Sequence, residues 1–190
     1  MRPQFELRLR RLSVALACLL AAGAFGAEQN PSKKEKPTMK LTSTAFTDGQ
    51  AIPVKHTCLG ADVSPALRWT DVPVGTKSLA LICDDPDAPV GTWVHWVLWG
   101  LPPSATELPE KVPTSETLPS GAKQGLNDFR RIGYGGPCPP AGKPHRYFFK
   151  LYALDADLPL KPRATKQDLE AALQGHILAQ AQLLGTYQRR

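Results

Sequence analysis

The sequence predicts a mainly β protein, an antiparallel β-sandwich with short helices near its C-terminal end. Four stretches of the 190-residue chain either alternate between apolar and polar positions or are rich in β-branched and aromatic residues. Clusters of proline and glycine separate them. The 19 prolines are easier to place in the loops and edges of a sandwich than in a helical bundle. Helical periodicity is convincing near the C-terminus alone.

The N-terminal 27 residues have the pattern of a secretory signal peptide. Four arginines precede an apolar run at 12–25, and small residues follow. The run is too short to span a bilayer stably, so we expect a signal peptide at 1–27 and a periplasmic or secreted protein. Lipid attachment at Cys18 is a less favoured alternative, because Ala15 stands three positions earlier and the apolar run continues past the cysteine.

Residues 28–38 are rich in lysine and proline and nearly free of apolar side chains, which predicts a disordered linker. The segment 39–190 then forms one domain, since about 150 residues suffice for a single core. The whole chain has a formal charge of +6, but residues 1–27 carry four arginines and one glutamate, so +3 remains without them. A charge this small, with no basic stripe, argues against nucleic-acid binding.

We predict β-strands at 39–46, 78–83, 92–101 and 146–154. In the third, period two places Trp93, His95, Val97 and Trp99 on one face, with Val94, Trp96 and Leu98 on the other. Both faces are apolar, so this strand should be central. In the last, His145, Tyr147, Phe149 and Leu151 share a face, opposite Arg146 and Lys150.

The C-terminal segment predicts two short helices packed on the sandwich. Thr165 can cap the first helix, with Asp168 at its third position. Leu169, Leu173 and Ile177 repeat every fourth residue along one side. A glycine at 175 should break or bend the helix, and another at 185 should end the second.

Two segments rich in proline and glycine carry the residues most suited to a ligand site. In the first, Asp85 and Asp87 lie in a proline-stiffened turn, and His95 follows on an apolar strand. The second is the loop at 133–140, which leads into a strand headed by His145. Glycine lets a backbone approach a ligand closely, and proline fixes the backbone in advance. The sequence therefore predicts that both imidazoles open onto one cavity.

Together these segments resemble the phosphatidylethanolamine-binding protein family, whose two hallmark regions are D-P-D-x-P…H and G-x-x-x-P-P…H-R-Y. The nearer resemblance is to its bacterial and archaeal branch, called Raf-kinase-inhibitor-like. The segments 58–69 and 175–179 also fit this branch, so the resemblance covers roughly residues 40–187.

The resemblance implies a sandwich whose pocket holds phosphate-like groups and phospholipid head groups. It also implies that the backbone N–H before the double proline, at Cys138, faces the anion. Asp87 could instead close a turn, and Tyr134 could brace its loop. The expected ligand-binding residues are Asp85, Asp87, Pro89, His95, Tyr134, Cys138, His145 and Tyr147.

Three cysteines, Cys58, Cys83 and Cys138, remain beyond the signal segment. An oxidising compartment allows one internal disulfide among them, and the sequence leaves the pairing open. They form no CxxC pair, which argues against structural zinc. We expect no metal and no cofactor.

We therefore expect an exported protein that binds a small phosphate-like or carboxylate anion and has a regulatory or inhibitory role. No G-x-S-x-G or HExxH motif is present, so an enzyme is not expected, and a His/Asp hydrolase is the weakest alternative. Relatives are described as inhibitors of kinases or serine proteases. An envelope or extracellular protease is thus an alternative partner, for which the polar segment 102–123 could serve as the contact loop. Homodimer formation stays open.

Overall fold

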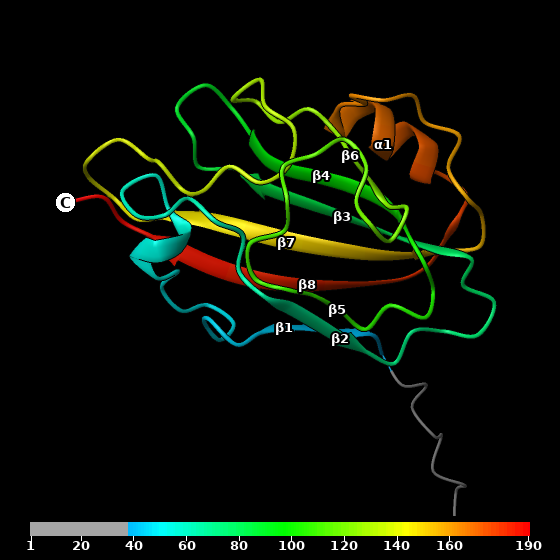
Figure 1. The fold of residues 1–190 in the computed structure, drawn as a ribbon. Coiled ribbons are helices and arrows are strands. Elements are labelled where there is room, and N and C mark those ends of the chain that lie inside the picture. The colour runs from blue at the N-terminus through cyan, green and yellow to red at the C-terminus, as the bar shows by residue number, and fades with distance from the viewer. Residues whose placement is uncertain (1–37) are drawn as a thin grey trace, which may run out of the picture. The chain divides into compact units, whose positions relative to one another are not determined.

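The computed structural model describes residues 38–190, which form two antiparallel β-sheets and little helix (Figure 1). The mainly β fold class is therefore confirmed. The predicted signal peptide and nearly all of the predicted linker lie outside the described residues. The strands are β1 (Lys40–Ser43), β2 (Leu67–Thr70), β3 (Ser78–Asp85), β4 (Trp93–Leu101), β5 (Glu107–Leu108), β6 (Lys123–Gln124), β7 (His145–Leu154) and β8 (Ile177–Tyr187). The helices are the 3-10 turn η1 (Val54–His56) and α1 (Lys166–Leu173).

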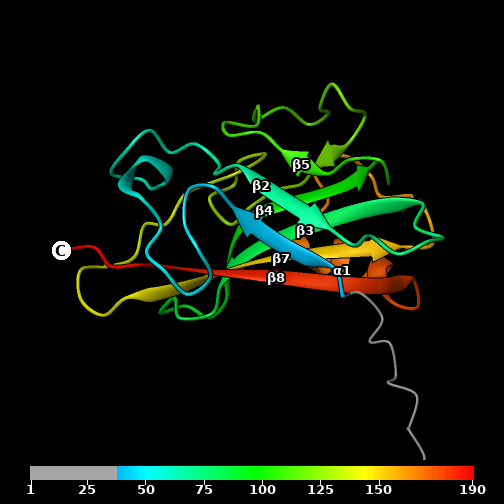
Figure 2. The same ribbon diagram turned by 90° about the horizontal axis from the view of Figure 1, so that it is seen from below.

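The larger sheet has the strand order β6-β4-β3-β7-β8, and the smaller has the order β1-β2-β5. Figure 2 shows the small sheet on one face of the large sheet and α1 on the other. Two apolar clusters fill these interfaces. One contains Leu81, Trp96 and Phe149 together with residues of β1 and β2, and the other packs Ile82 and Trp99 against α1. Strands β3 and β4 are thus buried on both faces, which explains their nearly continuous apolar sequences.

Strand β7 has the predicted alternation. Tyr147, Phe149 and Leu151 face the small sheet and are buried, whereas Arg146 points to solvent. Lys150 lies on the Arg146 face but is only partly exposed, because it pairs with a carboxylate there. The sequence therefore gives the orientation of this strand correctly.

Strand β4 departs from strict alternation at His95. Cys83 pairs with Trp96 and Asp84 with Val94, so His95 is an extra residue without a partner across β3. Such a β-bulge puts two consecutive side chains, here His95 and Trp96, on the same side of the strand and so shifts the alternation by one residue. As a result, Val97 and Trp99 face α1, whereas His95 contacts Tyr147 on the opposite side. The predicted common face of Trp93, His95, Val97 and Trp99 is therefore wrong.

The capping box at the start of α1 is confirmed. The side chain of Thr165 accepts from the backbone N–H of Asp168, and the Asp168 carboxylate accepts from the backbone N–H of Thr165. Leu169 and Leu173 are buried against the large sheet. No helix among residues 38–190 is long and apolar enough to cross a membrane.

The second predicted C-terminal helix is wrong, because its residues form β8. This 11-residue strand pairs along its length with β7, from His145 opposite Tyr187 to Leu154 opposite Ile177. Its inward positions Ala181, Leu183 and Tyr187 follow period two, and the residues at 182, 184 and 186 between them are more exposed. The four-residue spacing of Ile177 from Leu173 is coincidental, since the chain reverses at Gly175 with φ of 82°.

Candidate functional site

A small cavity lies at the end of the large sheet where β3 ends and β4 and β7 begin. Antiparallel neighbours bring Asp85, Trp93 and His145 to the same edge, although 60 positions of sequence separate the first from the last. The cavity has a volume of about 200 Å³. It is lined by Asp85, Ala88, Pro89, Val90, Trp93, His95, Phe129, Cys138, Pro139, Pro140 and His145. The prediction that both histidines open onto one hollow is met by this lining.

His95 is held rigidly at the floor of the cavity. Its Nδ1 lies 2.6 Å from the carbonyl oxygen of Gly135, and its own carbonyl accepts from the backbone N–H of Gly135. The ring packs edge-on against Phe129 and Tyr147, at centroid distances of 5.4 and 5.1 Å. Because a carbonyl oxygen can only accept, Nδ1 must carry the proton. The residue is 2% exposed, and among the described residues Nε2 has no hydrogen-bond partner.

His145 is oriented by a carboxylate. Its Nδ1 lies 2.8 Å from Oδ2 of Asp85, and both side chains are nearly buried. A carboxylate accepts, so Nδ1–H donates to it and Nε2 is left for the cavity. The other oxygen of Asp85 accepts from the backbone N–H of Asp87, which closes the turn after β3. Asp85 therefore fixes both the histidine and the loop beside it.

The neighbouring aspartates have different partners. Asp84 points to the opposite face of the sheet, where its buried carboxylate accepts from Lys150 and from Lys166 of α1. Asp87 forms a two-pronged ion pair with Arg146 and also accepts from that residue's backbone N–H. The guanidinium hydrogen bond is the main reason why the pKa of Asp87 is lowered. Asp87 therefore braces the loop and does not line the cavity. This agrees with the alternative expectation that Asp87 has a structural role in the turn.

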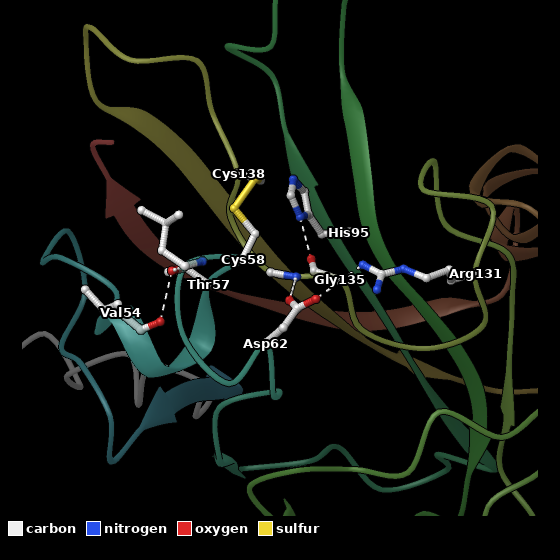
Figure 3. The surroundings of a disulfide bond; sticks show 10 residues. Val54, Thr57, Cys58, Asp62, His95, Arg131, Gly135 and Cys138 are labelled. Carbon is white, nitrogen blue, oxygen red and sulfur yellow. Dashed lines mark hydrogen bonds and ion pairs between the residues drawn. A yellow bond between two sulfur atoms is a disulfide. The ribbon is translucent and has the colours of Figure 1, made fainter. Parts of the chain in front are cut away.

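A disulfide between Cys58 and Cys138 joins the rim of the cavity to the loop after η1 (Figure 3). The sequence had left this pairing open, and Cys83 is a buried free thiol. The backbone N–H of Gly136 donates to Asp62 at 2.6 Å, and Asp62 also pairs with Arg131. Two adjacent loops are thereby clamped together beside His95.

Glycine is required at 136 because the clamped loops approach closely. A Cβ added at Gly136 would lie 2.4 Å from the carbonyl oxygen of His56 and 2.9 Å from the Cα of Thr57. These are backbone atoms, so the loop itself would have to move. The glycine at this position thus reflects contact with the loop after η1.

Both predicted tyrosines lie behind the lining. Tyr134 is buried against Trp96 and donates to the carbonyl oxygen of His56, so it braces its loop. Tyr147 packs edge-on against the His95 ring. Its buried hydroxyl has no hydrogen-bond partner of good geometry among the described residues. Burial, followed by the charge of Asp85, raises the pKa of Tyr147 well above its usual range. Neither tyrosine is among the residues that line the cavity, and Tyr134 has the loop-bracing role given as its alternative.

Phe129 is a wall residue that the sequence did not reveal. It lies in a polar loop whose start is fixed by Asp128, which accepts from the backbone N–H of Val94. Its ring packs edge-on against Trp93 and His95 and carries the Arg131 guanidinium 5.2 Å from its centroid. A lone aromatic between charged residues could have been noticed, but its contact with His95 depends on the fold.

The cavity offers two kinds of hydrogen-bonding group. Cys138 is exposed at the rim, and its backbone N–H donates to no acceptor in the described part of the chain. Nε2 of each histidine adds a nitrogen that can donate or accept according to its protonation. No group of three or more His, Cys, Asp or Glu side chains that could hold a metal ion occurs within residues 38–190.

Acidification should destabilise the folded protein through His95. Burial is the main cause of its lowered pKa, although Gly135 and nearby aspartates oppose the shift. Below the ordinary value of 6.5, the unfolded chain binds the proton more readily than the folded chain, so stability is lost as the pH falls through this value. We expect urea midpoints measured between about pH 7.5 and 5.5 to fall less in His95→Gln than in the unsubstituted protein. Parallel curves for the two proteins would contradict this assignment.

The fold and its cavity define a two-sheet β protein with a histidine-lined hollow at one end of the larger sheet. The family profile described as phosphatidylethanolamine-binding protein matches residues 42–188. The chain belongs to the phosphatidylethanolamine-binding protein family.

Relatives from distant organisms are similar over most of their own length. A UPF0098 protein of Methanothermobacter thermautotrophicus is 53% identical over 151 residues, which cover 80% of this chain and 99% of the relative. A UPF0098 protein of Aquifex aeolicus is 52% identical, with coverage of 80% and 89%.

Two solved structures share the fold. The putative phosphatidylethanolamine-binding protein homolog CT736 of Chlamydia trachomatis is 44% identical with a TM-score of 0.74, and the match covers 80% of this chain and 99% of that one. YbcL of E. coli, described as a new member of the mammalian PEBP family, is 35% identical with a TM-score of 0.76, with coverage of 81% and 100%.

Proposed function

We propose that this protein binds a small anionic group, such as a phosphate group, in the cavity between His95 and His145. The observation that carries the proposal is that both histidines line one hollow with Nδ1 already engaged, which leaves each Nε2 for a ligand, and that Cys138 lies at its rim. Each group is held from behind, by Gly135, by Asp85 and by the disulfide. Groups fixed in advance lose little freedom when a ligand arrives, which favours binding.

The size of the cavity favours a small ligand or the head of a larger one. Drug-sized ligands occupy roughly 300–1,000 Å³, whereas this cavity has about 200 Å³. Its walls are mostly apolar and His95 at its floor is buried, so the inner part of the cavity has a low dielectric constant. A hydrogen bond to a charged oxygen is stronger there than in water.

We further propose that the protein works outside the cytoplasm and binds its ligand without catalysing a reaction. A disulfide persists in oxidising compartments, in keeping with the signal-like pattern at 1–27. The lining residues include no serine, and the lining cysteine is bonded to Cys58. A regulatory or inhibitory role would follow if occupancy of the cavity changes what the neighbouring loops contact. No observation favours the protease-inhibitor alternative, because Leu108, Val112 and Leu118 of the segment 102–123 are packed into the core.

Inorganic phosphate should protect the protein against thermal unfolding, and the two histidines should be required for it. Phosphate at about ten times its Kd stabilises the folded state by about 1.4 kcal/mol, which corresponds to a Tm increase of about 3–5 °C. We expect the double variant His95→Ala, His145→Ala to show no increase in differential scanning calorimetry.

His176→Ala is the matched control for this experiment. His176 also donates through Nδ1 to an aspartate, Asp155, at 2.8 Å, but both are about half exposed and line no part of this cavity. The control should keep the full increase. Equal protection of the double variant would overturn the proposed function.

A further inference from the structure

The hydrogen-bonding character of the cavity narrows the class of anion that fits it. His95 offers an acceptor, since its single proton is on Nδ1 and is donated to Gly135. Burial disfavours a second proton on this ring, which leaves a lone pair on Nε2. An oxyanion oxygen without a proton would face this lone pair and be repelled. An oxygen that carries a proton would donate to it.

The other two groups suit the remaining oxygens of such a ligand. The backbone N–H of Cys138 is a donor, and Nε2 of His145 becomes a donor when that ring holds two protons. Asp85, 2.8 Å from Nδ1, then balances the charge of the imidazolium. A site in which His145 holds both protons would therefore offer two donors and one acceptor.

The charges around the cavity favour a singly charged ligand. The imidazolium of His145 would be the positive charge of the lining and is already matched by Asp85. Two cations next to lining residues are engaged in ion pairs, Arg146 with Asp87 and Arg131 with Asp62. A doubly charged anion would bring excess negative charge next to a buried carboxylate, which costs free energy in a medium of low dielectric constant.

We propose that the cavity selects oxyanions that carry their own proton, namely inorganic phosphate and phosphomonoesters, over sulfate and phosphodiesters. This inference rests on the proposed function and names the ligand class of the same site. The shared chemistry is a tetrahedral oxyanion with one P–OH group that donates to Nε2 of His95. Sulfate has a similar shape but carries no proton near neutral pH. In a phosphodiester, a second ester group takes the place of the P–OH group that a phosphomonoester keeps.

The test compares four anions by isothermal titration calorimetry at pH 6.5 and constant ionic strength: inorganic phosphate, methyl phosphate, sulfate and dimethyl phosphate. A phosphomonoester is still partly protonated at this pH, because its second pKa is about 6. We expect phosphate and methyl phosphate to bind at least about tenfold more tightly than sulfate and dimethyl phosphate, since a buried acceptor left without a donor is costly. The first two anions distinguish a free phosphate from a phosphate on a larger molecule, and dimethyl phosphate represents a lipid phosphodiester.

The outcomes separate this inference from the proposed function. Binding of sulfate or dimethyl phosphate as tight as that of phosphate would overturn the inference and leave anion binding intact, whereas no binding of any of the four would overturn the proposed function.

His95→Gln adds a second measurement. A carboxamide can turn its N–H₂ toward the ligand, so the phosphate-to-sulfate affinity ratio should fall toward one. His176→Gln should keep the ratio of the unsubstituted protein, and an unchanged ratio in His95→Gln would also contradict the inference.

Discussion

Removal of the disulfide by the double substitution Cys58→Ser, Cys138→Ser should lower the free energy of unfolding by about 4 kcal/mol. The bond joins residues separated by 80 positions. In the chain-entropy account, a cross-link across a loop of this length removes about 4 kcal/mol worth of freedom from the unfolded state. Tm should therefore fall by about 8–16 °C in calorimetry.

Reduction of the unsubstituted protein should reproduce this loss. Cys138 is exposed at the rim, so a thiol reagent can reach the bond. The control is the same reductant added to the double variant, where it should leave the midpoint unchanged because Cys83 is a buried free thiol. A reduced protein as stable as the oxidised one would show that other contacts hold the two loops together.

The affinity for phosphate should change less than the free energy of unfolding in the variant Cys58→Ser, Cys138→Ser. The loops stay connected by the hydrogen bond from Gly136 to Asp62, the hydrogen bond from Tyr134 to His56, and the ion pair between Arg131 and Asp62. These contacts keep the backbone N–H of Cys138 near its place. We therefore expect the Kd for phosphate to rise less than about tenfold, at a temperature well below the lowered Tm.

The features predictable from the sequence are those set by local patterns. The face of β7 follows from strict period two, and the start of α1 follows from a capping box formed within four residues. The ligand loops carry visible proline and glycine signals. His145 also follows directly, because it is the first residue of a regular strand.

The features that could not be predicted depend on pairing between distant segments. The bulge at His95 is defined by its register against Cys83 and Asp84, which the sequence of β4 does not contain. The disulfide depends on how two loops meet. Tyr147 lies on the predicted face of β7 but does not reach the cavity. The bulge places the His95 ring against Tyr147, and His95 lines the cavity in its place. The alternation of β8 is interrupted at Leu183 and Leu184, and the four-residue spacing before the strand favours a helix.

The substitution Asp85→Asn should weaken phosphate binding by about 10- to 100-fold, because a hydrogen bond to a charged group contributes about 1.5–3 kcal/mol. The carboxylate accepts from two donors, Nδ1–H of His145 and the backbone N–H of Asp87. A carboxamide of the same shape has one oxygen, so one of these donors loses its acceptor. The ring of His145 also loses the carboxylate that orients it.

Asp155→Asn provides the comparison by titration calorimetry, because its carboxylate meets Nδ1 of His176 at the same 2.8 Å. That pair is about half exposed and lines no part of the cavity, so its loss should leave the Kd unchanged. If Asp85→Asn bound phosphate as tightly as the unsubstituted protein, the pairing of His145 with Asp85 could not be what holds the anion. Asp85 would then act through Asp87 alone, as the residue that closes the turn after β3.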